Sequence, residues 1–271
     1  NDCSSVKTSY NHIYQFIHLL SNSTASTPTD VWIPSSDNVK PQISDQWTVG
    51  YFRNFRKNLY ESSFEIYYKN LQNQIDYKNG ADLVFNSTVE SQLVYGHGWA
   101  YGAEYLFRKN YGRLTGWFGY TWSKAMRQFD LKNSGRPFPA RQDRRHDVSV
   151  VVQYNLSRKL ILSANWVYNT GNAVTFPYGK YTIDGRTVGY YTEQNGYRMP
   201  DYHRLDLGLT WLRKKTEKIE SSWNFSVYNA YARENAYYIS FRQKEDNPDQ
   251  TEAVQVSLFK FIPSISYKFK F

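Results

Sequence analysis

Two short motifs hold residue types that could hydrolyse a bond. His146 directly precedes Asp147, and Asp201 lies just before His203. A histidine held by a carboxylate can act as a general base that activates water. Polar residues at the start of a strand produce the same motifs without any chemistry, and a short motif alone is a weak signal of a site. We therefore expect no catalytic residue in these motifs and predict that the chain is not an enzyme.

A basic loop could capture an anion. The arginines Arg136, Arg141, Arg144 and Arg145 cluster around Asp143. Guanidinium groups bind carboxylate and phosphate through paired hydrogen bonds, which suits an anionic solute or the phosphates of lipopolysaccharide. The same residues could instead form a structural ion-pair cluster. We retain the four arginines as candidate ligand-binding residues.

A second loop, between Asn169 and Asp201, is rich in tyrosine. It carries Tyr178, Tyr181, Tyr190, Tyr191 and Tyr197. Exposed aromatic rings can stack on a solute and combine a large apolar surface with a polar tip. Loop aromatics also pack on one another, which needs no ligand. The first four of these tyrosines are further candidate ligand-binding residues.

The composition points to a folded β-protein. Aromatic residues make up 18% of the 271 residues, with 25 tyrosines, although mean hydropathy is only -0.69. A disordered chain would lack these aromatics. A membrane-spanning helix needs a run of about 18 apolar residues, and the longest candidate, Ile13 to Leu20, is interrupted by Gln15 and His18. Many tyrosines with modest hydropathy suit a transmembrane β-barrel, in which every second residue faces lipid.

Charge and cysteine content exclude other classes. The single cysteine, Cys3, cannot form an internal disulfide, and no zinc-ligand spacing occurs. We expect no metal and no cofactor. The net charge of +9 is spread over turns and loops rather than gathered into one stripe, so we expect no nucleic-acid partner. The chain starts at Asn1 without a signal region, so we expect a processed product or a piece of a longer protein.

Alternation of apolar and polar residues runs through the whole chain. In the last segment, Phe259 to Phe271, the odd positions are mostly aromatic and the even positions mostly lysine or serine. Such period-two alternation predicts a strand with one apolar and one polar face. Ten segments follow this pattern, and the first of them is the least clear. They cover about residues 12–19, 47–51, 64–68, 101–107, 114–122, 148–156, 160–168, 202–211, 222–231 and 259–271.

The connections between these segments alternate in length. Short connections lie near residues 56–58, 108–112, 155–159 and 212–221, and long ones lie between them. A bacterial outer-membrane barrel has short periplasmic turns and long extracellular loops. A soluble β-sandwich would not keep this parity. The pattern predicts antiparallel transmembrane strands whose last member ends at the periplasmic face, and hence a cell outer-membrane location in a Gram-negative bacterium.

Several segments carry a family pattern. They are GYFRNFRKNLYESSFEIYYKNLQNQIDYKNGA from Gly50, FPARQDRRHD from Phe138, ANWVYNTGNAVTFP from Ala164, YRMPDYHRLDLGL from Tyr197, WNFSVYN from Trp223, and the terminal Tyr267 to Phe271. As a set they resemble the later barrel segments of TonB-dependent outer-membrane receptors of the type with a carboxypeptidase-regulatory-like N-terminal domain. The resemblance covers nearly the whole chain.

The resemblance implies a 22-stranded barrel with an N-terminal plug that takes up a scarce nutrient with energy from the TonB complex. We expect residues 1–271 to be the C-terminal part of such a barrel, without the plug. The implied partners are outer-membrane lipid and lipopolysaccharide, the plug and N-terminal strands, the TonB complex through that missing part, the barrel-assembly machinery, and as an option a surface lipoprotein. Tyr267, Phe269 and Phe271 resemble the terminal signal that the assembly machinery reads.

Three alternatives stay open at this point. A ten-stranded barrel could close on itself, with an interior largely filled by side chains. Such a barrel could be a rim protease, because omptin-type proteases are ten-stranded and carry acidic and histidine residues at the outer rim. A soluble β-sheet binding module is the third alternative, which the alternation of loop lengths disfavours.

Overall fold

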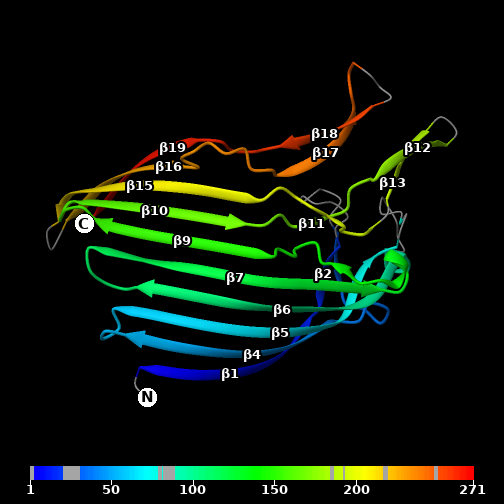
Figure 1. Cartoon of the computed structure of the whole chain (residues 1–271), viewed down its shortest axis with the longest axis horizontal. Helices are drawn as coiled ribbons and strands as arrows, with labels where there is room; N and C mark the ends of the chain where they lie inside the picture. The colour runs from blue at the N-terminus through cyan, green and yellow to red at the C-terminus, as the bar shows by residue number, and fades with distance from the viewer. Residues whose placement is uncertain are drawn as a thin grey trace.

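Ten strands form one antiparallel sheet in which neighbours in the chain are neighbours in space (Figure 1). The computed structural model describes residues 3–20, 31–78, 81, 89–183, 186–191, 193–215, 219–246 and 250–271. The strands are β1 Ser4–Gln15, β4 Gln42–Phe55, β5 Tyr60–Tyr77, β6 Leu93–Lys109, β7 Leu114–Phe129, β9 His146–Asn155, β10 Leu160–Asn169, β15 Tyr202–Lys215, β16 Glu220–Tyr228 and β19 Ile262–Lys270. A short strand, β8 (Phe138–Pro139), pairs beside β7. The prediction of an all-β antiparallel fold with about ten long strands is confirmed.

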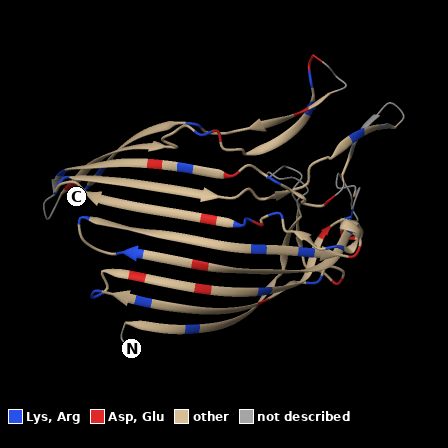
Figure 2. Cartoon of the chain, in the orientation of Figure 1, with Lys and Arg blue, Asp and Glu red and all other residues tan. Residues whose placement is uncertain are grey.

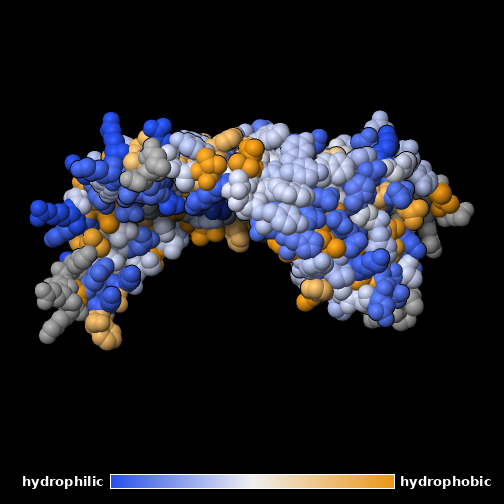
Figure 3. Space-filling view, turned by 90° about the horizontal axis from the view of Figure 1, so that it is seen from below, coloured by the Kyte–Doolittle hydropathy of each residue, from blue (hydrophilic) through white to orange (hydrophobic). Residues whose placement is uncertain are grey.

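The sheet does not close on itself. Within the part of the chain that the structure describes, β1 pairs only with β4 and β19 pairs only with β16. Seen from below, the molecule is an arch hollowed on one side (Figure 3). The alternative of a self-closed ten-stranded barrel is therefore wrong for this structure, because the sheet curves too gently to bring its two edge strands together.

The predicted alternation of short and long connections is confirmed. The four short turns lie at one end of the sheet, together with both chain termini, and the long connections lie at the other end (Figure 1). Three residues with positive φ, at Arg56, Lys57 and Asn58, make the turn between β4 and β5 compact.

The long connections contain short elements. These are β2 Ile17–Leu20, β3 Val31–Pro34, β11 Ala173–Val174, β12 Gly179–Ile183, β13 Arg186–Tyr190, β14 Tyr197–Arg198, β17 Tyr238–Gln243, β18 Thr251–Val256, and the 3-10 helices η1 Val89–Gln92 and η2 Asn133–Gly135. Among the described residues, no helix has the length and apolar character to cross a membrane.

Side chains alternate between an apolar face and a polar face, as period-two patterning requires. On the apolar face, Leu162 of β10, Phe225 of β16 and Ile265 of β19 lie in one row across the sheet and are exposed. A neighbouring row on the polar face consists of small residues, Ser163, Gly208, Ser226 and Ser264. Exposed apolar side chains in such a row indicate a face that contacts lipid rather than water.

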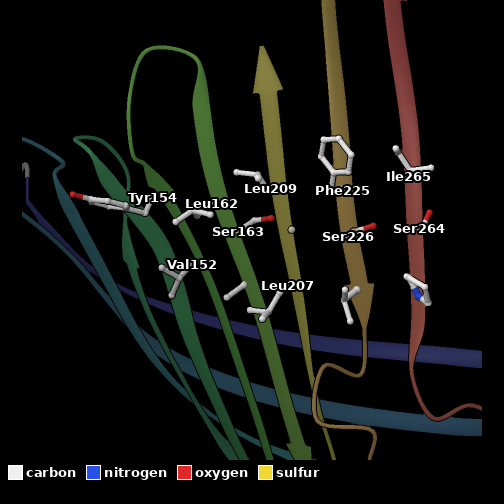
Figure 4. A pocket seen from close by; sticks show the side chains of 14 residues that line it. Val152, Tyr154, Leu162, Ser163, Leu207, Leu209, Phe225, Ser226, Ser264 and Ile265 are labelled. Atoms are coloured by element: carbon white, nitrogen blue, oxygen red, sulfur yellow. The ribbon is translucent and has the colours of Figure 1, made fainter. Parts of the chain in front are cut away.

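A groove of about 810 Å³ crosses the apolar face over β9, β10, β15, β16 and β19 (Figure 4). It is lined by rows of apolar side chains, including Leu162, Leu207 and Phe225, and by the small residues of the neighbouring row (Figure 4). Its apolar lining and its place on the outward face suit lipid chains. The groove is therefore not a candidate site for a polar solute.

Aromatic side chains lie near both ends of the apolar face. Towards the long loops, the Trp47 ring centroid lies 5.5 Å from that of Tyr10 and 6.2 Å from that of Tyr68. Towards the short turns, Trp223 packs on Tyr267 with a centroid distance of 4.8 Å. Two such belts at the ends of an apolar band are typical of a transmembrane barrel wall.

Several predicted boundaries were wrong. The first long strand is Ser4–Gln15 rather than residues 12–19, because twelve backbone pairs with β4 hold a segment whose two faces are both largely polar. The last strand starts at Ile262, so Phe259 and Phe261 precede it. β5 continues through an irregularity between Leu71 and Gln74 to Tyr77, well beyond residue 68.

A small buried core lies at the long-loop end, formed by Leu20, Val39, Ile75, Tyr77 and Leu93. His18, two residues before Leu20 on β2, is fully buried there. Its Nε2 atom lies 2.9 Å from the Ser35 hydroxyl, and within the described chain its Nδ1 atom has no hydrogen-bond partner. Burial lowers the pKa of His18 below its ordinary value.

Candidate functional site at the long-loop end

Asp143 joins two long loops. Its carboxylate is buried and accepts a 2.6 Å hydrogen bond from the backbone N–H of Ala125 on β7. The guanidinium of Arg198 forms an ion pair with the same carboxylate and donates a 2.6 Å hydrogen bond to the Asp143 carbonyl oxygen. Arg145 adds a longer contact of 3.6 Å. The loop before β9 is thereby fixed to the loop before β15.

Two further contacts bring these loops together. The Thr170 hydroxyl oxygen accepts hydrogen bonds from the backbone N–H groups of Arg145 (2.8 Å) and His146 (3.0 Å). Gly171 approaches the backbone of Met199 so closely that a Cβ atom at Gly171 would lie 1.5 Å from the Met199 carbonyl oxygen. Only glycine fits this close approach. The two loops therefore form a single fixed unit over one end of the sheet.

The four predicted arginines differ in their surroundings. The Arg145 guanidinium lies 3.6 Å from the Asp143 carboxylate, which is the kind of contact that the ion-pair alternative expects. Arg141 is half-buried. Arg136 and Arg144 are exposed, and neither forms an ion pair with a residue that the structure describes. Arg136 and Arg144 are thus the most exposed of the four candidates.

The four candidate tyrosines gather on one projecting hairpin, β12–β13 (Figure 1). All four are exposed, between 46% and 71%. Gly179 pairs with Tyr190 and Tyr181 pairs with Val188, so strand alternation places Tyr181 and Tyr190 on one face of the hairpin. Tyr178 and Tyr191 belong to the opposite face. The tyrosines are therefore brought together, but as two surfaces rather than one.

A second projecting hairpin, β17–β18, contacts the tyrosine loop. Phe176 packs edge-on against Phe241 of β17 with ring centroids 5.1 Å apart, and it also packs against Tyr197 at 5.9 Å. Tyr197 thus packs on another aromatic residue of its own loop, which is the alternative that needs no ligand. The hairpins β12–β13 and β17–β18 rise together beyond the sheet (Figure 1).

In the His146–Asp147 motif, the two side chains do not face each other. His146 and Asp147 are adjacent in β9, so their side chains point to opposite faces of the sheet. The Nδ1 atom of His146 lies 2.9 Å from the Tyr120 hydroxyl. Asp201 accepts hydrogen bonds from the Tyr168 hydroxyl (2.8 Å) and the Gly171 N–H (3.1 Å). These residues fix strand ends, which is the reading that the structure supports over a rim protease.

Metal-ligand types are not clustered within the described residues, where no group of three histidine, cysteine, aspartate or glutamate side chains could hold an ion. The single cysteine, Cys3, is exposed.

A group of contacts between β15 and the end of β16 was not predicted. The Arg204 guanidinium stacks on the Tyr228 ring at 4.1 Å and pairs with Asp206 at 2.9 Å. Asp206 also accepts a 2.9 Å hydrogen bond from the N–H of Asn229, which is buried with φ 55°. The available signal was the alternation in YHRLDLGL, which places Arg204 and Asp206 on the same face.

An open antiparallel sheet with one lipid-type face, one polar face, short turns at one end and fixed long loops at the other is a wall segment of a transmembrane β-barrel. Residues 4–230 match the family described as TonB dependent receptor-like, beta-barrel. The chain belongs to this family, and its location is the outer membrane of a Gram-negative bacterium. No curated protein matches the chain.

Solved receptors share the fold. The ferripyoverdine receptor of Pseudomonas aeruginosa superposes with a TM-score of 0.62 at 13% identity, over 100% of this chain and 31% of the receptor. BauA, the ferric preacinetobactin receptor of Acinetobacter baumannii, gives 0.54 at 14%, over 98% and 34%. The FrpB iron transporter of Neisseria meningitidis gives 0.56 at 12%, over 99% and 37%. The chain thus spans about a third of these proteins.

Proposed function

We propose that residues 1–271 are the C-terminal part of a TonB-dependent receptor that imports a scarce nutrient across the outer membrane. The main support is the loop unit fixed by Asp143, Arg198 and Gly171, because it holds exposed arginine and tyrosine side chains over one end of the sheet. A solute held there lies beside the polar face, which would become the inner wall of the complete barrel.

The polar face supports a plug as the partner inside that barrel. Glu65 of β5 and Glu104 of β6 are directly opposite each other, and neither forms an ion pair within the described chain. Like charges directly opposite in a sheet are destabilising unless a cation lies between them. A plug domain that presents lysine or arginine to this pair would remove the repulsion. The TonB complex would act through the plug, and lipopolysaccharide, the assembly machinery and a surface lipoprotein remain proposed partners.

Iron chelates are the first nutrient class to test. The ferripyoverdine receptor and the ferric preacinetobactin receptor, which share the fold, are named for such ligands. Deletion of the gene should abolish growth on one scarce nutrient, and deletion of tonB should abolish it equally. Unchanged growth of the deletion strain on iron chelates, vitamins, oligosaccharides and peptides as limiting nutrients would contradict the proposal.

Matched variants test the binding surface. Arg144→Gln removes a charge at the long-loop end, and Arg158→Gln removes one in the exposed turn between β9 and β10. For an anionic nutrient, we expect weaker binding only in Arg144→Gln. Replacement of Tyr181 and Tyr190 by alanine tests one face of the hairpin, and the same change at Tyr178 and Tyr191 tests the other.

A further inference from the structure

Lys69 of β5 and Arg127 of β7 are among the cations of the polar face that have no acidic partner. Within the described residues, neither forms an ion pair or a side-chain hydrogen bond. By contrast, Arg204 of this face pairs with Asp206 at 2.9 Å, and Lys132, in the loop after β7, pairs with Asp76 at 2.9 Å. Basic bands lie on β5 and β7 towards the long-loop end, and acidic bands lie nearer the middle of β5 and β6 (Figure 2).

The strand register places the two cations on either side of β6. Lys69 pairs with Ala100, Ala100 pairs with Ala125, and Gly98 pairs with Arg127. With strands about 4.8 Å apart and about 3.4 Å per residue along a strand, the two Cα atoms are roughly 12 Å apart. Extended lysine and arginine side chains can both reach a group placed between them.

The wall between the two cations consists mainly of small residues. Gly98 has no side chain, and Ala100 and Ala125 have only a methyl group. The Leu71 side chain reaches over Gly98, with its Cδ1 atom 3.6 Å from the position of a Cβ atom there. Arg127 lies against this surface, because its Cγ atom is 3.5 Å from the position of a Cβ atom at Gly98. Lys69 lies at the other side, with its Nζ atom 5.3 Å from the centre of the Tyr67 ring. Two positively charged side chains therefore lie on either side of this stretch of small residues.

Asp76 does not neutralise Arg127. No ion pair or hydrogen bond joins the two among the described residues, and the Asp76 carboxylate is held by the buried Lys132. The group of Asp76, Lys132 and Arg127 therefore carries one excess positive charge, and Lys69 adds another. Unpaired cations favour binding of an anion.

We propose that Lys69 and Arg127 form an anion-binding site on the inner wall, which takes a carboxylate or phosphate group over Ala100. This proposal depends on the proposed function only because an anion must be able to reach the inner wall. That group has two possible sources, which are an anionic solute passing through the barrel and a carboxylate of the protein segment that fills the barrel.

Arginine labelling distinguishes these sources. The protein is purified in detergent from outer membranes, together with the segments that complete its barrel, and is treated with phenylglyoxal. Modification of Arg127 is then measured by peptide mass spectrometry, with and without inorganic phosphate or propane-1,2,3-tricarboxylate. Lys69→Gln is compared with Lys124→Gln, which removes the same charge from β7 on the apolar face, where Lys124 pairs with Tyr101.

For a soluble anion, we expect phosphate or the tricarboxylate to protect Arg127. The concentration needed should rise about tenfold in Lys69→Gln, because one of two charged contacts is lost, and should not change in Lys124→Gln. For an internal carboxylate, Arg127 should be unreactive without added anion and become reactive in about 1 M salt, which screens ion pairs. Either result supports the site.

Three results would overturn the site. They are modification of Arg127 at one rate under all conditions, no modification at any salt concentration, and protection that is equal in wild type and Lys69→Gln. Labelling is measured on purified protein and needs no uptake. Normal protection of Arg127 in a protein whose deletion leaves all nutrient uptake intact would therefore contradict the proposed function alone. Heat-modifiable migration on gels checks that each variant is folded.

Discussion

Replacement of Asp143 by alanine should release the two long loops from each other. The change removes the acceptor for the Ala125 N–H and leaves Arg198 without its carboxylate. Removal of one partner from a buried ion pair costs about 3–5 kcal/mol. Arg198 is 37% exposed and regains some hydration, so a smaller loss of about 2 kcal/mol applies to the loop contact. Asp143→Asn, which can still accept the Ala125 N–H, should lose about half as much.

Hydrogen exchange of the purified protein in detergent measures this loss. A local destabilisation of about 2 kcal/mol should speed exchange of the Met199 N–H, which donates to the Asn172 carbonyl oxygen, by roughly thirtyfold. Amides in the middle of β10 should not change. Arg242→Gln is the matched control, because it breaks an exposed ion pair with Glu252 on the β17–β18 hairpin. Unchanged exchange at Met199 in Asp143→Ala would refute the view that Asp143 holds the loops together.

Three further predictions concern other parts of the molecule. Burial lowers the pKa of His18 in the folded protein, so the imidazole binds a proton more readily when the loop is unfolded. The contribution of neutral His18 to the stability of the folded loop should therefore be fully present above pH 6.5. It should be lost as the pH falls towards the pKa of the folded state. The melting temperature should therefore fall more between pH 7 and pH 5 in wild type than in His18→Gln, and equal falls would count against this. Gly171→Val should destabilise the contact between the two loops by about 2 kcal/mol or prevent it, because the valine side chain would overlap the Met199 backbone. A melting temperature equal to that of wild type would exclude this clash. Deletion of Phe271, the third aromatic residue after Tyr267 and Phe269 in the proposed assembly signal, should lower the amount of protein in the outer membrane, whereas normal surface levels would refute that role.

Nine of the ten long strands were predictable because each carries its own local signal, whereas β1 was misplaced because both of its faces are largely polar. The alternation in Tyr202 to Trp211 requires no knowledge of the neighbouring strands, and the loop lengths on either side are visible in the sequence. The strand ends were less predictable. β5 passes through Asn73 at φ 54° and continues to Tyr77, since pairing with β6 maintains a segment whose own alternation is interrupted.

The candidate site was predictable as residue types but not as geometry. Exposed tyrosines and arginines could be named from the sequence. The Asp143–Arg198 ion pair joins residues 55 positions apart, and no local pattern connects them. The same applies to the role of Arg145, because four neighbouring arginines look alike until the fold turns one of them inward. Contacts between loops depend on strand register, which the sequence of a single strand does not fix.

The two open edges of the sheet make the isolated chain prone to aggregation. β1 and β19 present rows of backbone N–H and C=O groups without partners in the described structure. In water, such edges pair with any other extended chain and seed aggregates. Expression of these residues alone should therefore yield inclusion bodies.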